Sequence, residues 1–232
     1  AQCHLGFIYL NGEGVEQNDT EAAQWYQKAA EQGNIPAQNN LALMYLNGKG
    51  VAQDDAEAAK WYLEAARQGS ANARNMIAVL YQEGRGVAKD DAEAVKWLRE
   101  AAGQGIPDAQ FSLGVKYEKG EGVDRDDVEA VKWYRQAAGR GSTEALNTLK
   151  TMCSKGSSIA QFNLGLMYEE GQGVAQDYAE AVKWYTKAAG LGLAQAQFNL
   201  GLMYMEGDGL PQNDAEAVKW FRKAAVQNFA PA

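Results

Sequence analysis

Histidine and cysteine are scarce in this chain, and their scarcity limits the chemistry that it could carry. The 232 residues include one histidine, His4, and two cysteines, Cys3 and Cys153. A single histidine excludes a histidine-based metal cluster, and a Cys3–His4 nucleophile would lack the third group that orients the base. Two cysteines neither require nor exclude an oxidising compartment. The sequence therefore predicts no metal site and no cofactor.

Positive charge and long apolar runs are also missing. The chain carries 22 basic and 30 acidic side chains, which gives a formal net charge of -8, and no cluster of Lys and Arg interrupts this acidity. An acidic surface repels phosphate backbones, so nucleic acid is not expected as a partner. Glycine or charge interrupts every apolar stretch before it reaches the roughly 20 residues that cross a bilayer. Membrane insertion is therefore not expected either.

Recognisable catalytic motifs are absent as well. The Gly-x-Gly pairs follow no predicted strand and precede no Lys-Ser or Lys-Thr, so they do not fit a nucleotide-binding fingerprint. No Gly-x-Ser-x-Gly or Ser-x-x-Lys nucleophile motif occurs. Adjacent acids such as Asp54 and Asp55 have a simpler role at a helix start, where one caps the helix and the other favours its dipole. No catalytic residue is assigned, and neither an enzyme nor a small-molecule substrate is expected.

The chain does contain an internal repeat of 36 residues. Alanine marks the same repeat position at Ala1, Ala37, Ala73, Ala109 and Ala145, and again at Ala160, Ala196 and Ala232. A unit this short cannot bury its own apolar face, so it must stack on copies of itself. Cys3 and Cys153 then fall in distant units, and both are expected to be free thiols. Because the repeat phase begins and ends on the marked alanine, we expect the sequence to be a piece of a longer array.

Residues 37–72 illustrate one unit. Apolar residues recur at helical spacing in its first part and predict a first helix, which the paired glycines Gly48 and Gly50 end. The capping pair Asp54 and Glu57 predicts the start of a second helix, because each side chain can accept a first-turn backbone N–H. Every unit is therefore expected to form a helical hairpin. The whole chain is predicted to be an all-α, right-handed α-solenoid of antiparallel helical hairpins.

The signals that mark these hairpins recur in six units. The capping pairs are Asn18/Glu21, Asp54/Glu57, Asp90/Glu93, Asp126/Glu129, Asp177/Glu180 and Asn213/Glu216. Each capping Glu precedes Lys or another polar residue by three positions, and these side chains mark a solvated outer face. A tryptophan in each second helix is expected in the core: Trp25, Trp61, Trp97, Trp133, Trp184 and Trp220.

The recurring pattern resembles a known family. Ala-x-x-x-Leu-Gly-x-x-Tyr, then Gly-x-Gly-Val-x-x-Asp, then Ala-x-x-Trp-Tyr-x-x-Ala-Ala-x-x-Gly is similar to the Sel1-like repeat, a relative of the tetratricopeptide repeat, over nearly the whole chain. The resemblance implies an α-solenoid that acts as an adaptor in protein assembly, with no common catalytic residues. It favours an exported or periplasmic bacterial location over a cytoplasmic one. The chain departs from the cysteine-rich bacterial branch of the family, which has a disulfide in each repeat.

The repeat is broken once, between Ala145 and Ala160. The intervening segment has the spacing of a second helix without its tryptophan, yet it starts where a first helix should, so one helix is expected where two belong. We predict three parts: residues 1–141 with four Sel1-like repeats, residues 142–156 with a degenerate single-helix unit that kinks the array, and residues 157–232 with two repeats and a truncated C-terminal end. The break is either a tolerated deletion or a bend that shapes the binding surface.

Candidate binding residues are sought where the units differ. Positions 4, 8 and 11 of the first helices fall in one narrow sector and mix amides, methionine and charge, with phenylalanine alongside at position 3. Amides can hydrogen-bond a peptide backbone, and methionine adapts to irregular apolar partners. The candidate partner-binding residues are Asn40, Met44, Asn47, Met76, Lys116, Phe162, Asn163, Met167, Phe198, Asn199 and Met203. The alternative is that the Met and Phe side chains simply pack against the adjoining helix.

The function predicted from these observations is a non-catalytic scaffold or adaptor. First helices usually line the inner side of a curved hairpin array, so a protein or peptide partner is expected on the concave face that they form. Two other classes stay open at this point. One is a hydrolase that acts on cell-wall or lactam substrates, and the other is a purely structural spacer.

Overall fold

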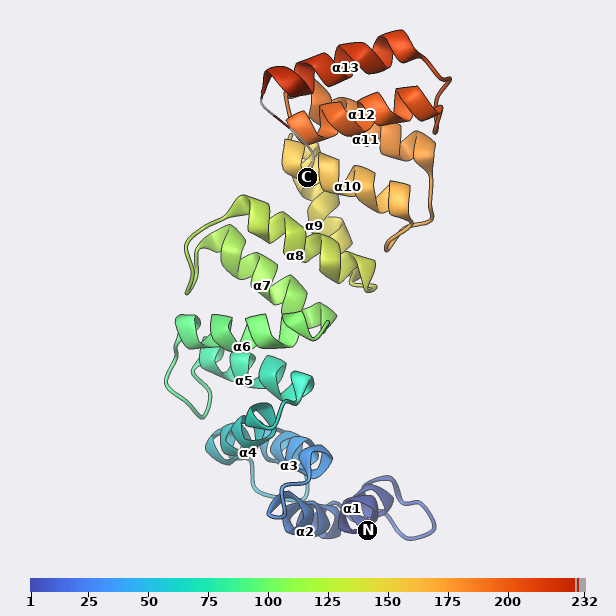
Figure 1. Ribbon diagram of the computed structural model, residues 1–232. Helices are drawn as coiled ribbons and strands as arrows, with labels where there is room; N and C mark the ends of the chain where they lie inside the picture. Colours follow the sequence, from blue (N-terminus) through green and yellow to red (C-terminus); the bar gives the residue numbers. More distant parts are fainter. Residues whose placement is uncertain (228, 230–232) are drawn as a thin grey trace. The chain divides into compact units, whose positions relative to one another are not determined.

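The fold consists of helices throughout the part of the chain that the computed structural model describes, residues 1–227 and 229 (Figure 1). The helices are α1 (Gln2–Asn11), α2 (Asp19–Ala30), α3 (Ile35–Asn47), α4 (Asp55–Arg67), α5 (Ala71–Glu83), α6 (Asp91–Gly103), α7 (Pro107–Lys119), α8 (Asp127–Gly139), α9 (Thr143–Ser154), α10 (Ser158–Glu170), α11 (Tyr178–Gly190), α12 (Ala194–Glu206) and α13 (Asp214–Val226). The predicted all-α fold of repeated hairpins is confirmed. Ala232, on which the repeat phase ends, lies outside the described residues.

Contacts between residues divide the chain into two compact units. The first comprises residues 1–109 and 119–124, and the second comprises residues 110–118 and 125–232. Helices α1 to α6 belong to the first unit and α8 to α13 to the second, while α7 is shared. The regular repeats can therefore be read in the first unit, and the break in the repeat lies wholly inside the second.

In the first unit, the helices pair as the hairpins α1–α2, α3–α4 and α5–α6, and the hairpins stack through α2–α3 and α4–α5 (Figure 1). Alanines make most of the contact surface of each second helix: in α4, Ala58, Ala59, Ala65 and Ala66 are all buried. Small side chains let neighbouring helices approach closely, so a short helix still buries a continuous face. The apolar stripe read from the repeat is thus the core.

Small residues of the first helices accommodate an aromatic ring of the second helix. A side chain on Gly165 would place its Cβ 2.6 Å from the Tyr185 ring, and one on Gly114 would meet the Tyr134 ring at 2.7 Å. Both tyrosines are fully buried. The helices of one hairpin therefore approach closely at this small residue, and the ring that fills the space belongs to the partner helix of the same hairpin.

The loops between paired helices contact the preceding repeat. Gly86 has φ +68°, and an added Cβ would lie 1.9 Å from the carbonyl oxygen of Asp55, the first residue of α4. The neighbouring Arg85 binds the Asp55 carboxylate, with an Nη2–Oδ1 distance of 2.8 Å. Gly50 stands in the same relation to Asp19 in α2, at 2.0 Å. In regular stacking, each loop therefore covers the N-terminal end of the second helix before it.

Each second helix begins at its predicted cap. The Asp54 carboxylate accepts the backbone N–H of Glu57 at 3.0 Å, and Asn18 caps α2 in the same way. The second half of the expected capping box is wrong, because the Asp54 backbone N–H donates to the carbonyl of Tyr45 at 3.0 Å, and Glu57 pairs with Lys60 instead. The cap therefore ties the second helix to the first.

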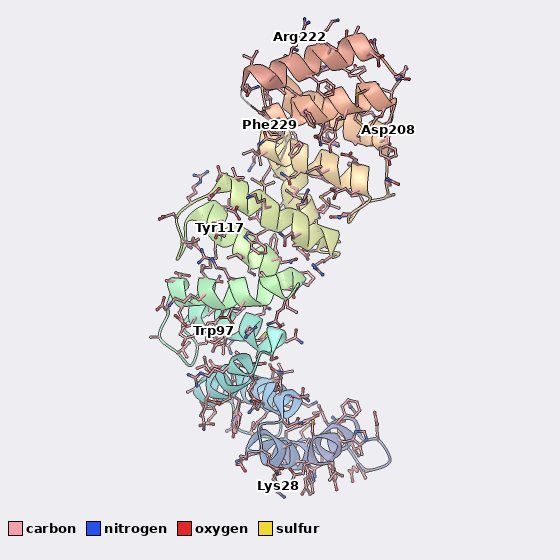
Figure 2. All side chains as sticks on the ribbon, viewed as in Figure 1. Lys28, Trp97, Tyr117, Asp208, Arg222 and Phe229 are labelled. Carbon is pink, nitrogen blue, oxygen red and sulfur yellow. The ribbon has the colours of Figure 1, made fainter. Side chains whose placement is uncertain are left out.

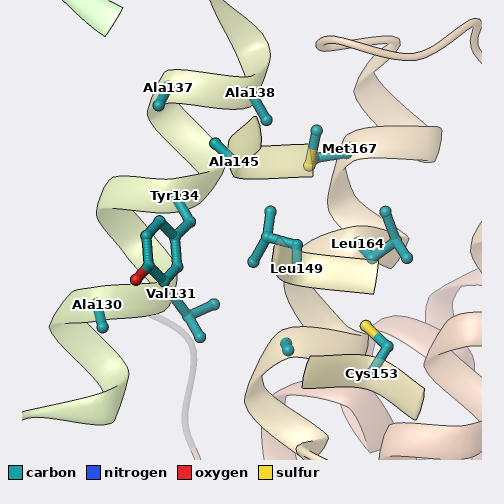
Figure 3. Packing of buried hydrophobic residues seen from close by; sticks show 11 residues of the cluster. Ala130, Val131, Tyr134, Ala137, Ala138, Ala145, Leu149, Cys153, Leu164 and Met167 are labelled. Carbon is teal, nitrogen blue, oxygen red and sulfur yellow. The ribbon is translucent and has the colours of Figure 1, made fainter. Parts of the chain in front are cut away.

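In the second unit, α9 lies between α8 and α10 and packs against both (Figure 3). Leu149 projects from α9 into a core that it shares with Tyr134 of α8 and with Leu164 and Met167 of α10. Cys153 is buried in the same cluster. A single helix therefore takes the place of a hairpin, as the broken repeat predicts.

Helix α9 begins like a first helix and ends like a second one. The Ser142 hydroxyl accepts the backbone N–H of Ala145 at 3.2 Å, as Ser70 does at the start of α5. At the other end, the Gln161 side chain of α10 donates to the carbonyl of Cys153 at 3.1 Å, and Gln38 of α3 donates to the last residue of α2 in the same way. The helix therefore acts as the first helix toward α8 and as the second helix toward α10.

This double role changes which helices are neighbours. Helix α10 packs directly against α8 as well as α9. An added Cβ on Gly173, in the loop after α10, would lie 2.3 Å from the carbonyl oxygen of Ala138, near the C-terminal end of α8. In the regular steps, the equivalent glycine faces the N-terminal end of a second helix. Inside the second unit, α10 therefore lies beside both of the helices that precede it, α8 and α9, and the predicted kink of the array stays a prediction.

Candidate functional site

The outer surface of the second helices carries the predicted ion pairs. Lys60 and Glu57 lie 3.0 Å apart and Lys96 and Glu93 lie 2.6 Å apart, and both pairs are largely solvated. Exposed pairs of this kind contribute little to stability, because water and salt screen the attraction between the two charges. This face is therefore a solvated surface with little binding character of its own.

The tryptophans are only partly in the core. Each is half-buried, and the ammonium groups of Lys28, Lys187 and Lys223 lie 4.3, 4.1 and 3.8 Å from the ring centroids of Trp25, Trp184 and Trp220. The side chains labelled in Figure 2 include Lys28 and the half-buried Trp97. The predicted core position of the series holds in part, because Tyr26 and most of its equivalents, one residue further on, are the residues that are buried. The rings of Trp25, Trp184 and Trp220 also pack beside a lysine.

Three methionines of the candidate binding set belong to the core. Met44, Met167 and Met203 are exposed by 4%, 0% and 4%, and each lies in a cluster of buried residues. Their expected position on a free inner face is wrong, because position 8 of the first helix points at the preceding second helix. These side chains are covered by neighbouring helices and pack in the core.

Several polar members of the set are also engaged inside the array. Lys116 and Asn163 are buried, and the Asn163 amide donates to the carbonyl of Ile159 at 2.9 Å. Asn199 lies beside the buried Tyr185 hydroxyl, whose pKa burial raises far above its usual range while the Asn199 amide acts in the opposite direction. Asn40 stands in the same relation to a tyrosine of α2. The amides at position 4 therefore contact buried tyrosines or backbone.

The remaining members are accessible to different degrees. Asn47 is exposed at the end of α3, while Met76 is half-buried against the core of the first unit. Phe162 and Phe198 are half-buried, and their rings lie 5.7 and 5.5 Å from the aromatic rings of the facing second helices. The phenylalanines at position 3 are therefore the predicted residues that combine an apolar side chain with access from outside.

Position 7 of the first helices carries a signal that the sequence reading missed. Phe7 and Leu43 are 44% and 48% exposed, and Leu166 occupies the same position, half-buried, in α10. Positions 3 and 7 lie about 100° around the helix from positions 4 and 8. Large apolar residues recurring at position 7 were the available signal. The accessible stripe is therefore displaced by one residue from the expected one.

A groove of about 460 Å³ opens in the second unit where α8 lies beside α10. Helix α8 contributes Val128, Lys132, Arg135 and Gln136, which form one face of that helix. Helix α10 contributes Ile159, Phe162, Asn163 and Leu166, which also share a face. Leu193 and Gln195 at the start of α12 complete the lining. Phe162 and Asn163 are the two predicted site residues that the structure brings to this groove.

The groove has an apolar floor and a basic side. Lys132 pairs with Glu129 at 2.5 Å, but Arg135 makes no ion pair with any residue that the structure describes. The lining contains no carboxylate. Apolar surface beside an available guanidinium suits recognition of an apolar side chain next to a carboxylate, because arginine can bind both carboxylate oxygens.

Other titratable groups serve packing. The Tyr134 hydroxyl donates to the Glu118 carboxylate at 2.6 Å, and burial together with this bond raises the tyrosine pKa above its usual range. Burial also raises the pKa of the Cys153 thiol to about 12, so the thiolate that attacks electrophiles is not formed at neutral pH. Among the described residues, no group of His, Cys, Asp and Glu is arranged to hold a metal ion. In the same residues, every helix is too short or too polar to cross a membrane.

Comparison with known proteins gives six repeats. The Sel1 repeat matches residues 1–34, 35–70, 71–106, 107–142, 158–193 and 194–229. The stretch left between the fourth and fifth matches holds α9. The match therefore stops and restarts at the single helix.

Two solved structures resemble the chain over nearly its whole length. A protective antigen of uropathogenic Escherichia coli strains that displays an SLR fold is 38% identical, with a TM-score of 0.59, and the match covers 98% of this chain and 46% of the antigen. This chain thus spans less than half the length of that antigen. A Sel1 repeat protein from Oxalobacter formigenes is 35% identical, with a TM-score of 0.58, and the match covers 99% of this chain and 86% of that protein. The comparison with curated proteins found no match.

The family assignment rests on the matched repeats and on the similar solved structures. Six matched repeats account for most of the chain, and the two bacterial structures share its helical repeat fold. Proteins of this kind are generally non-enzymatic scaffolds, and their repeats typically bind other proteins. The chain belongs to the Sel1 repeat family.

Proposed function

We propose that this chain is a non-catalytic scaffold that binds a protein or peptide partner through the accessible face of its first helices. The observation that carries the proposal is the accessible apolar side chain at position 7, Leu43 in the first unit and Leu166 in the second, which Phe162 at position 3 joins in the second unit. Apolar side chains repeated along an array give a partner several contacts at once. We do not propose nucleic acid, a membrane or a small-molecule substrate as the ligand.

The candidate residues divide by role within this proposal. Asn47, Phe162 and Phe198 are accessible enough to contact a partner. The buried Met44, Met167 and Met203 support the helices from behind, with Asn40, Met76, Lys116, Asn163 and Asn199 around them. A partner is therefore expected to contact the residues at positions 3, 7 and 11. The buried residues at positions 4 and 8 support the helix that presents these contact residues.

Affinity capture with cross-linking from the source organism tests the proposal. The variant Leu43→Glu places a charge on the proposed face, and Val218→Glu places one on an equally exposed apolar residue of a second helix. We expect Leu43→Glu to lower partner recovery at least several-fold and Val218→Glu to leave it unchanged. Equal recovery with both variants in folded protein would contradict binding by the first helices.

The other two classes are tested in the same preparation. A substrate-turnover screen that finds activity abolished by one side-chain substitution would replace the scaffold with an enzyme. Failure to cross-link any specific partner, in repeated captures with the intact chain, would favour a structural spacer. The scaffold predicts a captured partner and no such turnover.

A further inference from the structure

The groove between α8 and α10 exists because the repeat is broken. In the regular steps a second helix packs on the helix that follows it, as in α2–α3 and α4–α5, whereas α8 packs on α9 and also on α10, the next helix after that. The solvated face of α8, with Val128, Lys132 and Arg135, is thereby brought against the accessible face of α10 with Phe162 and Leu166. Residues that are an outer surface elsewhere in the array become one side of a groove.

Two lining residues differ in kind from their repeat equivalents. Val128 is 43% exposed, and the residues at its repeat position in the other second helices are one threonine and four alanines, Thr20, Ala56, Ala92, Ala179 and Ala215. Ile159 occupies a position that is polar or proline elsewhere, at Pro36, Asn72, Asp108, Glu144 and Gln195. Both larger apolar residues line the groove. The repeat scaffold does not require them, so their apolar surface is a property of this place.

The charge of the groove is opposite to that of the chain. The whole sequence carries a net charge of -8, yet the lining combines Lys132 and Arg135 with no carboxylate. Lys132 is partly neutralised by Glu129, which leaves the Arg135 guanidinium as the available cation. Local positive charge in the groove attracts a negatively charged ligand.

We propose that this groove binds a peptide segment of a partner protein in which apolar side chains are flanked by Asp or Glu. The apolar side chains lie on Phe162, Leu166 and Val128, and a carboxylate of the segment pairs with Arg135. The volume of about 460 Å³ is in the range of ligand pockets and suits a few side chains, not a whole domain. This inference rests on the proposed scaffold function and gives it one site and one class of ligand.

Panning of a random 12-residue peptide library on the intact chain tests the proposal. Enriched peptides are synthesised with a fluorescent label, and their dissociation constants are measured by fluorescence anisotropy. We expect Asp or Glu within a few residues of Leu, Ile, Phe or Val in the enriched peptides. We also expect weaker binding as sodium chloride is raised, because salt screens the pair with Arg135.

Matched variants place the binding in the groove. Arg135→Glu and Val128→Asp alter the lining, while Arg222→Glu and Ala215→Asp make the same changes at the same repeat positions of α13, outside it. All four positions lie on second helices, and Val128 and Ala215 are in the first turn, where an added Asp suits the helix dipole. We expect the groove variants to weaken peptide binding at least tenfold and the α13 variants to change it less than twofold.

The outcomes separate this inference from the scaffold function. Enriched peptides that are basic or uncharged, or that bind Arg135→Glu as well as the native chain, would overturn the groove and leave the scaffold standing at another face. If the library gives no enriched peptide while cross-linking still captures a partner, the inference is likewise overturned and the scaffold stands. Failure of both experiments would overturn both proposals.

Discussion

Stacking in the first unit and stacking around α9 in the second use the same local contacts in different order. In the first unit, Gly50 and Gly86 cover the N-terminal ends of α2 and α4. In the second, Gly173 packs against the C-terminal end of α8 instead. The difference shows that, where one helix serves both roles, the following loop covers the opposite end of the second helix.

The consequence for binding is that the first-helix face is not a uniform surface. In the first unit, Leu43 stands exposed on α3. In the second, Phe162 and Leu166 face Val128 and Arg135 of α8 across a groove. The regular region offers a repeated stripe, whereas the broken region offers an enclosed site of mixed character.

Restoring the missing helix should have the largest effect, on the affinity of the groove for peptides. Replacing residues 145–156 with a copy of residues 73–105 completes a regular repeat and keeps every residue that lines the groove. Helix α10 should then be separated from α8, and peptides selected on the native groove should bind at least about tenfold more weakly, a loss of about 1.4 kcal/mol. Fluorescence anisotropy measures the affinity, and circular dichroism checks that the helices form. Undiminished affinity in the folded variant would show that the broken step does not create the site.

Substitution of the loop glycines in the regular region should have the next largest effect, on the free energy of unfolding. Gly86→Ala forces a Cβ against the Asp55 carbonyl at positive φ, and the expected loss in free energy of unfolding is about 3 kcal/mol. Gly14 has φ +75° with open space around it, so Gly14→Ala should lose only about 1 kcal/mol for the backbone strain. Urea unfolding of both variants gives the difference. Equal losses would mean that the contact between repeats adds nothing.

The cap of α9 tests whether this helix behaves as a first helix. Ser142→Ala and Ser70→Ala each remove a side chain that accepts a first-turn N–H, and each should lower the free energy of unfolding by about 1 kcal/mol. Denaturant titration of the two variants provides the comparison. A negligible cost at Ser142 beside a normal cost at Ser70 would assign α9 the role of a second helix only.

The other end of α9 gives a pH test. The pKa of Cys153 is raised to about 12 by burial, so above about pH 9 the unfolded chain loses the thiol proton while the folded chain keeps it. The free energy of unfolding should therefore fall as pH rises from 9 toward 12, by about 1 kcal/mol at pH 10 from this group. Denaturant unfolding of the native chain and of the Cys153→Ala variant is measured between pH 7 and 10. The difference between the two pH profiles gives the contribution of the Cys153 thiol. Parallel pH profiles would show that the thiol is not buried in this way.

The outer ion pairs should give the smallest effects. Glu129→Gln frees Lys132 at the groove, and Glu216→Gln frees Lys219 at the same position of α13. Each should cost only about 0.3 kcal/mol in stability. Only Glu129→Gln should strengthen binding of acidic peptides, by about twofold, because it restores a cation to the groove. An equal gain at both sites in anisotropy measurements would reflect net charge alone.

Most of the fold could be read from the repeat. The cap at Asp54 and the small residue at Gly165 each act within one hairpin, and local spacing identifies them. The single helix between Ala145 and Ala160 was also predicted, because a hairpin cannot be made from so short a segment. Local chemistry therefore determined where each helix begins and most of the residues that form its core.

The site was harder to read, since it depends on angles between helices. Met44 and Leu43 are adjacent in sequence, yet one is buried and the other exposed. A rotation of about 100° separates them, and amino-acid type alone does not fix which side faces the next hairpin. Arg135 was missed for a similar reason, because a charged residue of a second helix reads as solvated surface.

The class of the fold, the repeat, the caps and the place of the break are written in the order of the residues, because they follow from short-range hydrogen bonds and periodic apolar residues. Only the tertiary structure decided that α10 packs beside α8 and that Val128, Arg135 and Phe162 share a groove. The physical reason is that α9 can satisfy its caps toward both neighbours at once. That choice of neighbour depends on packing between helices that no single repeat contains.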